Sequence, residues 1–354
     1  MRTAAATAIV LGLVTACRPT VARDRPPPPG TPGVDPGLAL AADARVDLVS
    51  IVARLAGYPE YNDAHTRYAR AVDAHFARFR DHPAVQTATA LRRDHGISFN
   101  APVSLAAYLD DTLAPRGPLV PTPAELDRRW QEVDLPAFVA QLQAFARDAD
   151  LAGFRAAYAA ELRRSEAALG DAIAGYRLVD WFAARFGARP PLRPRLVPSL
   201  LTGDNNYAAR TVGADGGLDA LMVIAVGDRA VPRSMTYIVA HELAHSYVNP
   251  ILDARAAVIA PAAAAVWSRS SARMAAQHYA AAQQMIDESA VRALVVAFAR
   301  ERGPTGAAAE QLAEERRNGF AWIAAMTDAL DRLPRPVDPD AMATAVRDVF
   351  AAVR

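Results

Sequence analysis

The chain has 354 residues, of which 52% are hydrophobic, so it is long enough to bury a sizeable core in one large or two modest domains. Its 39 basic residues are all arginine and are balanced by 38 acidic residues, which leaves a formal net charge of +1. This balance offers no electrostatic attraction to a polyanion, and we expect no nucleic acid as a partner. The abundant arginine and alanine are typical of a GC-rich coding sequence and do not indicate a functional arginine patch.

Residues 1–16 predict a secretory signal peptide. Met1 and Arg2 form a short basic start, an apolar run follows, and small residues precede Cys17. The run is too short for a stable membrane-spanning helix. The sequence Val14-Thr-Ala-Cys17 is similar to the lipobox of bacterial lipoproteins, in which the cysteine becomes the lipidated first residue. We therefore expect the only cysteine to carry a lipid anchor; the alternative is an ordinary signal peptide with an incidental cysteine.

Residues 17–37 predict an extended tether. Pro26-Pro-Pro-Pro29 and the glycines after it leave little that could be buried in a core. Such a segment would hold a folded domain away from a membrane surface. Arg18 stands directly after Cys17, where aspartate would retain a Gram-negative lipoprotein in the inner membrane. We expect a protein of the bacterial cell envelope, anchored to the outer membrane and facing the periplasm or the surface.

Residues 38–188 predict a helical N-terminal region. Apolar residues recur at helical spacing, and glycine and proline signals such as Gly57-Tyr-Pro59 and Gly96 separate the segments. The last predicted helix breaks near Gly170 or Gly175. The predicted helices cover Val46–Leu55, Tyr68–Phe79, Ala84–Arg93, Leu105–Leu113, Pro123–Glu132, Pro136–Asp150 and Leu151–Phe186.

Residues 189–354 predict a zincin-like catalytic region that begins with a small, mostly antiparallel sheet. The segments Leu196–Leu201, Asn206–Val212 and Leu218–Val226 are short, apolar and partly β-branched, with turn signals between them. Tyr207–Arg210 is a candidate edge at which an extended substrate could add as a strand; a purely structural strand is the alternative. With helices before and after the sheet, the expected fold class is α+β, mostly α.

The stretch after the sheet predicts a helix with a metal site. It contains His241-Glu242-Leu-Ala-His245, the HExxH pattern of zinc metallopeptidases. Histidines at i and i+4 lie on one face of a helix, so both imidazoles can bind one ion. Glu242 lies about 100° around the helix from His241, where it can act as general base on a water at the metal.

The flanks of this motif favour a buried helix over an exposed polar turn. The residues on both sides of the motif are uncharged, whereas a surface helix in so charged a chain should carry charges. Ser234 is predicted to cap the start of the helix, and Pro250 is predicted to end it near Val248 or Asn249.

Glu288 is the best candidate for a third ligand. A catalytic zinc ion takes three protein ligands and keeps one position open for water. Glu288 lies among apolar residues in a long helix predicted over Ala272–Arg302, and burying an unpaired carboxylate is costly unless a metal compensates. A salt bridge to Arg292, one turn on, is the alternative. Asp287 and His278 are weaker ligand candidates. Two closing helices are predicted over Ala307–Leu333 and Asp340–Val353.

The chain resembles a bacterial family of unknown function, DUF4932-like, in the gluzincin clan of metallopeptidases. The resemblance implies Zn²⁺ as cofactor, with His241, His245 and Glu288 as its ligands and Glu242 as the catalytic base. The segments that carry the resemblance are His241–Pro250, Glu288–Ala293, Val46–Gly57, His75–Pro83 and Gly96–Ala101.

One position departs from the better-known gluzincins. These enzymes place an acidic residue four positions after the ligand glutamate to orient the first histidine, and this chain has Arg292 there. Asp253, Asp287 or a backbone carbonyl would have to take that role. The group that stabilises the oxyanion stays open, with Tyr279 expected on the helix face opposite Glu288. The other candidates for that group are Tyr207, Tyr247 and His278.

These features predict a lipid-anchored, secreted zinc metallopeptidase of gluzincin type that hydrolyses peptide or protein substrates. The first alternative is a non-catalytic surface lipoprotein that binds a partner through its helical region and has a structural or vestigial metal. The second is a cell-wall or amide hydrolase that uses the same site. In each case the lipidated N-terminus would contact the membrane.

Overall fold

The computed structural model describes residue 35 and residues 37–187, 192–213, 215–229, 231–277 and 279–353. The predicted signal peptide, most of the predicted tether, Cys17 and His278 therefore lie outside the described residues. The described chain is mostly helical and contains one four-stranded sheet. This confirms the predicted fold class, α+β and mostly α.

The chain forms two units, and each unit combines separate stretches of sequence. The first comprises Ala39–Leu169 and Leu192–Val231; the second comprises the described parts of Gly170–Pro191 and Pro232–Arg354. The sheet thus groups with the N-terminal helices. Helix α9 (Leu178–Phe186) groups with the C-terminal helices. The predicted regions, 38–188 and 189–354, are two continuous stretches of the chain, whereas each observed unit combines separate stretches.

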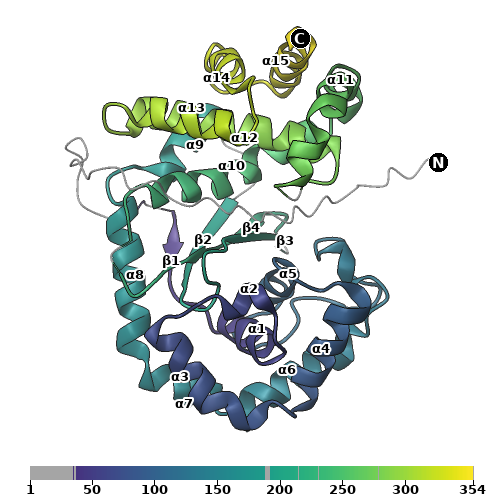
Figure 1. The fold of residues 1–354 in the computed structure, drawn as a ribbon, viewed down its shortest axis with the longest axis vertical. Coiled ribbons are helices and arrows are strands. Elements are labelled where there is room, and N and C mark those ends of the chain that lie inside the picture. The colour runs from purple at the N-terminus through teal and green to yellow at the C-terminus, as the bar shows by residue number, and fades with distance from the viewer. Residues whose placement is uncertain are drawn as a thin grey trace. The chain divides into compact units, whose positions relative to one another are not determined.

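Helix α1 (Ala44–Leu55) is the buried centre of the first unit. The carboxylate of Asp43 accepts the backbone N–H of Arg45 and so caps the start of the helix. The residues from Arg45 to Arg54 are all buried, so the helix needs partners on every side. Figure 1 shows α1 surrounded by other helices of this unit. These are α2 (Pro59–Asn62), α3 (Arg67–Phe76), α4 (Pro83–His95), α5 (Ala101–Ala107), α6 (Leu135–Asp148) and α7 (Leu151–Ala157).

Two predicted helices of this unit are wrong, because short polar side chains form turns instead. Asp110 accepts the backbone N–H groups of Thr112 and Ala114, so the segment predicted as helix Leu105–Leu113 turns after α5. Asp127 accepts the backbone N–H of Arg129, and only the short 3₁₀ helix η2 (Arg128–Trp130) forms within Pro123–Glu132.

The sheet has the strand order β1-β2-β4-β3. Its strands are β1 (Ala39–Leu40), β2 (Leu192–Ser199), β3 (Tyr207–Val212) and β4 (Leu218–Ala225), so the three predicted strands form close to their predicted bounds.

The pairing of the strands is mixed, which corrects the prediction of a mostly antiparallel sheet. β3 and β4 pair antiparallel, whereas β2 pairs parallel with both β1 and β4. Parallel neighbours need a crossover connection, which the helices between β1 and β2 and the strand β3 between β2 and β4 provide. β3 is an edge strand, as predicted for Tyr207–Arg210.

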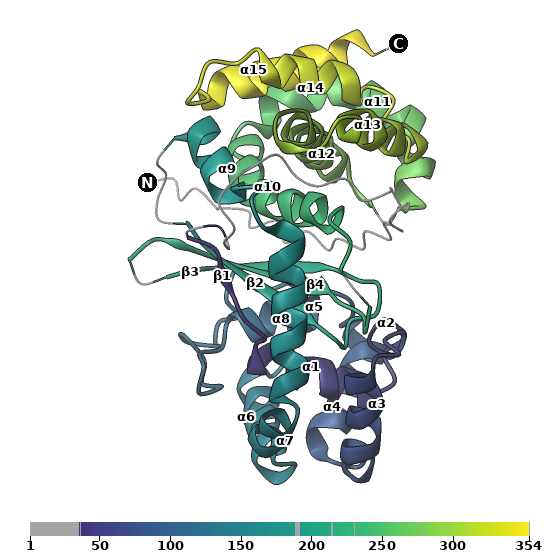
Figure 2. The ribbon, with the colours of Figure 1, turned by 90° about the vertical axis from the view of Figure 1, so that its left-hand side faces the viewer.

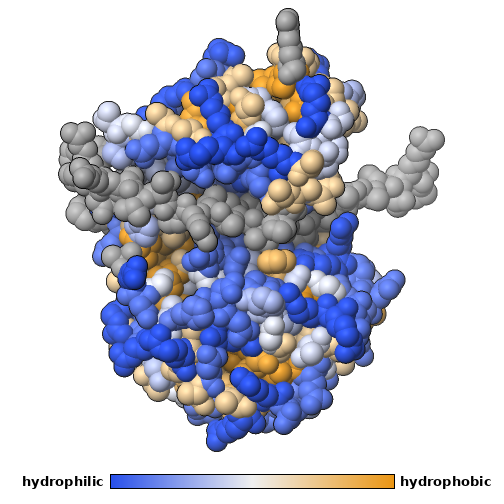
Figure 3. Space-filling model, viewed as in Figure 1, coloured by the Kyte–Doolittle hydropathy of each residue, from blue (hydrophilic) through white to orange (hydrophobic). Residues whose placement is uncertain are grey.

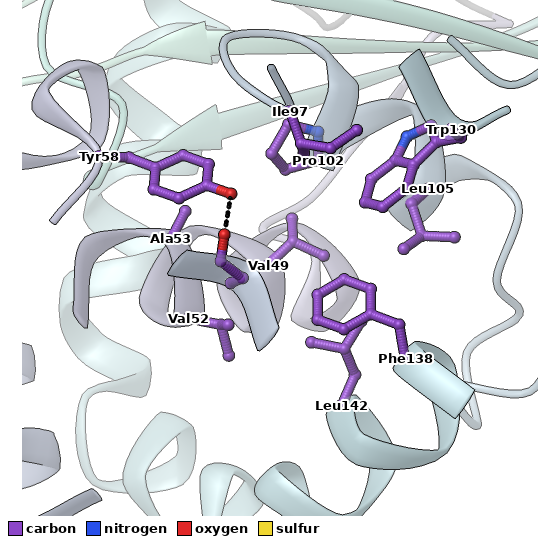
Figure 4. Close-up of a pocket in the computed structure, with 11 residues that line it drawn as sticks. Val49, Val52, Ala53, Tyr58, Ile97, Pro102, Leu105, Trp130, Phe138 and Leu142 are labelled. Atoms are coloured by element: carbon purple, nitrogen blue, oxygen red, sulfur yellow. Dashed lines mark hydrogen bonds between the residues drawn. The ribbon is translucent and has the colours of Figure 1, made fainter. Parts of the chain in front are cut away.

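A small apolar cavity lies within the first unit. Figure 4 shows the rings of Tyr58, Trp130 and Phe138 and the side chain of Val49 pointing toward it. The hydroxyl of Tyr58 donates a hydrogen bond to the carbonyl of Ala88 at 2.8 Å. Because its lining carries no charged residue, this cavity is a gap in the packing of the core and has no acid, base or metal ligand.

Helix α12 (Ala282–Arg302) is the buried centre of the second unit. Every residue from Met285 to Ala299 is buried, including several charged ones. In Figure 2 this helix is seen nearly end-on, with α10 on one side and α14 on the other. The helices around it are α10 (Met235–Asp253), α11 (Ala256–Ala275), α13 (Ala307–Arg317) and α14 (Ile323–Asp331), and α15 (Pro339–Ala352) packs on α11 and α14.

The visible surface of each unit is mostly hydrophilic, with small apolar areas between charged side chains (Figure 3). Val120, Val212 and Val258 are the exposed large hydrophobic residues of the described chain. Within the same residues, no single helix is both long and apolar enough to cross a membrane. Only α10 and α11 together pass that test, as a pair bent by 103°. The residues of α10 are almost all buried in the protein, which is typical of a core helix.

Candidate functional site

Helix α10 carries the HExxH motif through the interior of the second unit. It begins after Ser234 as predicted, although the serine side chain makes no capping hydrogen bond. The prediction that Pro250 ends the helix is wrong, because α10 continues to Asp253. Proline removes only one helical hydrogen bond, and burial of Ile251 and Leu252 beyond it offsets that loss.

Three side chains from α10 and α12 converge at one point. The Nε2 atoms of His241 and His245 are 3.2 Å apart. Nε2 of His245 lies 3.3 Å from Oε1 of Glu288, and Nε2 of His241 lies 3.6 Å from Oε2 of the same carboxylate. Among the described residues these three side chains form the group whose ligand atoms could hold one metal ion. The structure thus brings together all three predicted metal ligands.

The spacing of these atoms fits a small metal ion. Zinc binds nitrogen and carboxylate oxygen at about 2.0–2.2 Å, and a tetrahedral arrangement then separates its ligand atoms by roughly 3.3–3.5 Å. Nε2 of His245 lies 3.2 Å from Nε2 of His241 and 3.3 Å from Oε1 of Glu288, close to this range, and the 3.6 Å separation joins His241 to Oε2 of Glu288. Two imidazoles and one carboxylate are also the ligand types that zinc and similar divalent transition metals prefer.

The protonation states of the cluster also suit a cation. Burial is the largest effect on His241 and lowers its pKa to about 3, so the imidazole is neutral near pH 7 and keeps a lone pair for a metal. Burial alone would raise the pKa of Glu288, but the charge of Arg292, which bonds its carboxylate, holds that pKa below its usual value. Glu288 is fully buried, and its Oε1 accepts no hydrogen bond. A buried carboxylate oxygen without a donor is costly, and a bound cation would remove that cost.

Arg292 donates a hydrogen bond to the other carboxylate oxygen of Glu288, the third candidate ligand. Its Nε donates to Oε2 of Glu288 at 3.0 Å, so the predicted alternative, a salt bridge between these residues, is present together with the histidine cluster. Nη1 of Arg292 donates to Oε2 of Glu315 on α13 at 2.5 Å, and the guanidinium lies 4.7 Å from the centre of the Phe320 ring. Arg292 therefore bridges Glu288 and Glu315. The sequence did not indicate that Glu315 lies at this cluster.

Tyr279 corrects another prediction. The long helix expected over Ala272–Arg302 is two helices, because α11 ends at Ala275 and α12 begins at Ala282. Tyr279 lies in the connection between them, so helical periodicity does not place it opposite Glu288. Its buried hydroxyl accepts a hydrogen bond from Nη2 of Arg292 at 2.8 Å, and burial raises the pKa of this hydroxyl well above its usual value. Tyr279 is thus held near the ligand glutamate as a neutral phenol.

Asn249 is not among the predicted site residues, but it contacts the candidate ligand His245. Its Oδ1 lies 3.1 Å from Nδ1 of His245, and the side chain is buried. The contact joins residues at i and i+4 on one helix face, so the spacing alone could have indicated it. Metal-bound histidines often donate their second ring N–H to a carboxylate, and the side-chain oxygen of Asn249 stands at the corresponding position beside His245.

The remaining candidates are placed as follows. Glu242 is buried on α10, directly after His241. Asp287 is buried and accepts a hydrogen bond from Gln283 at 2.8 Å, and an orienting role for Asp287 or Asp253 stays a prediction. Tyr247 packs its ring on Phe182 and Phe186 of α9, and Tyr207 belongs to the sheet of the first unit, where its ring stacks on Tyr61.

A comparison with protein families gives one match. The family model described as Domain of unknown function (DUF4932) matches residues 38–336, which include the helices of the first unit, the sheet and both helices of the metal-ligand cluster. No curated protein and no solved structure matches the chain. The predicted resemblance to this family is therefore confirmed, and the chain belongs to the DUF4932 family.

Proposed function

We propose that the protein is a zinc metallopeptidase of gluzincin type that cleaves peptide or protein substrates. The observation that carries this proposal is the convergence of His241, His245 and Glu288 from two helices, at separations that suit one metal ion. The HExxH order supports it further, because it places a buried carboxylate, Glu242, directly after the first ligand.

His241, His245 and Glu288 would hold the metal, and Glu242 would move the proton. A bound zinc ion would act as a Lewis acid toward the peptide carbonyl and lower the pKa of a water molecule. Glu242 would accept a proton from that water and return it to the leaving amine, as general base and then general acid. Its burial, at 1% exposure, keeps the carboxylate away from bulk water.

The salt bridge between Arg292 and Glu288 favours one alternative function. Arg292 already supplies a positive partner to the ligand carboxylate, so the cluster has a charge-paired state without a cation. The alternative is a non-catalytic lipoprotein that binds its partner through the helical first unit and has a structural or vestigial metal. For such a protein this salt bridge would be sufficient to hold the cluster together. The Oε1 atom of Glu288, which accepts no hydrogen bond, favours the metallopeptidase.

The proposed location is the bacterial cell envelope, with Cys17 lipidated and the folded chain tethered to the outer membrane. The sequence from Val14 to Cys17 supports this. We expect wild-type protein expressed in a Gram-negative host to incorporate labelled palmitate and to fractionate with membranes. Cys17→Ser should lose both properties; a Cys17→Ser protein that keeps its membrane association would contradict a lipid anchor.

The function is tested by metal content and peptide hydrolysis on purified protein. We expect about one zinc ion per wild-type chain by mass spectrometry and zinc-dependent cleavage of a peptide library. Glu242→Gln should keep its zinc and lose hydrolysis, because it removes only the base. Glu310→Gln, the same change at an exposed glutamate of α13, is the matched control and should change neither.

The outcomes separate the candidate functions. Equal peptide hydrolysis in Glu242→Gln and wild type would contradict the proposed mechanism. Bound zinc without cleavage of any peptide would favour the non-catalytic lipoprotein. Cleavage of peptidoglycan but not of peptides from proteins would assign the same site to a cell-wall hydrolase.

A further inference from the structure

We infer that Asn249 is a positioning residue that sets the tautomer of His245 and so prepares its Nε2 for a metal ion. This inference rests on the proposed function, because it needs a metal at the cluster. Oδ1 of Asn249 lies 3.1 Å from Nδ1 of His245, while Nε2 of the same ring faces His241 and Glu288.

The orientation of the amide decides which ring nitrogen carries the proton. With the oxygen toward the ring, His245 donates its Nδ1–H to Asn249, and Nε2 keeps the lone pair that a cation needs. With the amide nitrogen toward the ring, Nδ1 would accept instead and Nε2 would carry the proton. The structure has the amide oxygen toward the ring, and this is the orientation that leaves Nε2 available to a metal ion.

The amide nitrogen of Asn249 supports a functional reason for this residue. Nδ2 is buried and has no hydrogen-bond partner, although the residue is only 2% exposed. A buried donor without an acceptor destabilises the folded protein. Asparagine is therefore a poor choice for packing alone at this position, whereas its oxygen serves the histidine. Residues that break a packing rule in this way are expected at functional sites.

Direct measurement of metal affinity tests the inference, with a chromophoric chelator as competitor for Zn²⁺. Asn249→Leu keeps a similar side-chain volume and removes the acceptor, and we expect its zinc affinity to fall about 10- to 100-fold. Asn249→Asp keeps the acceptor and adds charge, so it should bind zinc at least as tightly as wild type. Thr236→Val is the matched control, since Thr236 is also buried on α10 and its hydroxyl has no partner.

A second readout separates positioning from a merely structural role. Cobalt-substituted protein should show a changed visible absorption spectrum in Asn249→Leu and a spectrum close to wild type in Asn249→Asp. Circular dichroism of the metal-free proteins checks that each variant folds. If Asn249→Leu does not fold, Asn249→Ala gives the same comparison.

Three results would overturn the inference. Equal zinc affinity in Asn249→Leu and wild type would remove Asn249 from the site and leave the proposed function intact. Loss of affinity in Asn249→Asp as large as in Asn249→Leu would show that the acceptor does not matter. A wild-type protein that binds no zinc would overturn both the inference and the proposed function.

Discussion

The two units each have a buried central helix with charged residues, but they neutralise these charges differently. On α1 and its N-cap every buried carboxylate meets an arginine: Asp43 pairs with Arg45, and Asp47 pairs with Arg155. On α12 a single arginine, Arg292, meets two buried carboxylates, from Glu288 and Glu315. In the first unit two buried carboxylates face two arginines, so their charges balance. In the second unit Glu288 and Glu315 share the single charge of Arg292, which leaves one excess negative charge.

This difference indicates which network is structural and which can bind a ligand. In the first unit the guanidinium of Arg45 also donates to the carbonyl of Leu109 at 2.7 Å, so its hydrogen bonds are used within the chain. In the second unit Oε1 of Glu288 accepts no hydrogen bond and lies 3.3 Å from Nε2 of His245, while Nε2 of His241 lies 3.6 Å from Oε2 of the same carboxylate. Buried charge without a partner is unfavourable, and a divalent cation would neutralise the excess of the second network.

The largest expected effect is loss of metal binding when a ligand is removed. Glu288→Ala and His245→Ala should each abolish stoichiometric zinc binding, because two remaining ligands hold the ion weakly. Zinc content by mass spectrometry after dialysis checks this. If Glu288→Ala still bound one zinc ion per chain, Glu288 would not be a zinc ligand. The difference in charge between the two networks would then not explain metal binding.

Breaking the balanced network should cost stability and leave zinc affinity unchanged. Asp43→Asn leaves the buried guanidinium of Arg45 without its carboxylate, and we expect a loss of about 3–5 kcal/mol in the free energy of unfolding. Urea unfolding measures this loss. Asp94→Asn, at an exposed aspartate that pairs with Arg93, is the matched control and should cost far less stability, because solvent screens an exposed pair.

The same pair predicts a pH dependence. Burial alone would raise the pKa of Asp43, but its hydrogen bonds to Arg45 and the charge of that arginine hold the pKa below the usual value. The ionised form is therefore favoured in the folded protein, and its stabilising effect is present above the pKa of the unfolded chain. It is lost as the pH falls through the folded pKa. Acid titrations of stability should thus show a smaller loss at low pH for Asp43→Asn than for wild type.

A smaller effect is expected when the excess charge of the second network is removed. Glu315→Gln leaves Arg292 to face Glu288 alone, so the cluster becomes neutral without a cation. Zinc affinity should fall roughly tenfold, because one attractive charge near the ion is lost. Chelator competition measures this change in zinc affinity. A higher zinc affinity in Glu315→Gln than in wild type would show that the excess negative charge does not favour the cation.

The smallest effect is expected at the exposed arginine of α12. Arg300 pairs with Asp328 and Asp331 and is half-exposed, whereas Arg292 on the same helix is buried. Arg300→Ala should change the free energy of unfolding by less than about 1 kcal/mol and leave zinc binding unchanged. A large loss of zinc in Arg300→Ala would show that the metal site depends on the whole helix and not on the buried network.

Local spacing in the sequence determined the helix of the HExxH motif, its burial and the pair of histidines on one face, and the apolar neighbours of Glu288 indicated that its carboxylate is buried. These features follow from the helical repeat and from apolar neighbours, which act within a few turns of chain. The contact between His245 and Asn249 is equally local and could have been predicted.

Only the tertiary structure decided what surrounds the ligands. Tyr279 comes from the connection before α12 and Glu315 from α13, and both meet Arg292 because the packing of these segments places them there. The parallel pairing of β2 with β4 likewise depends on where the chain returns after β3. Such contacts join residues far apart in sequence, and no repeat or spacing along the chain encodes them. The HExxH motif therefore indicated two of the candidate ligands, while packing of α10, α12 and α13 set the charge around the cluster.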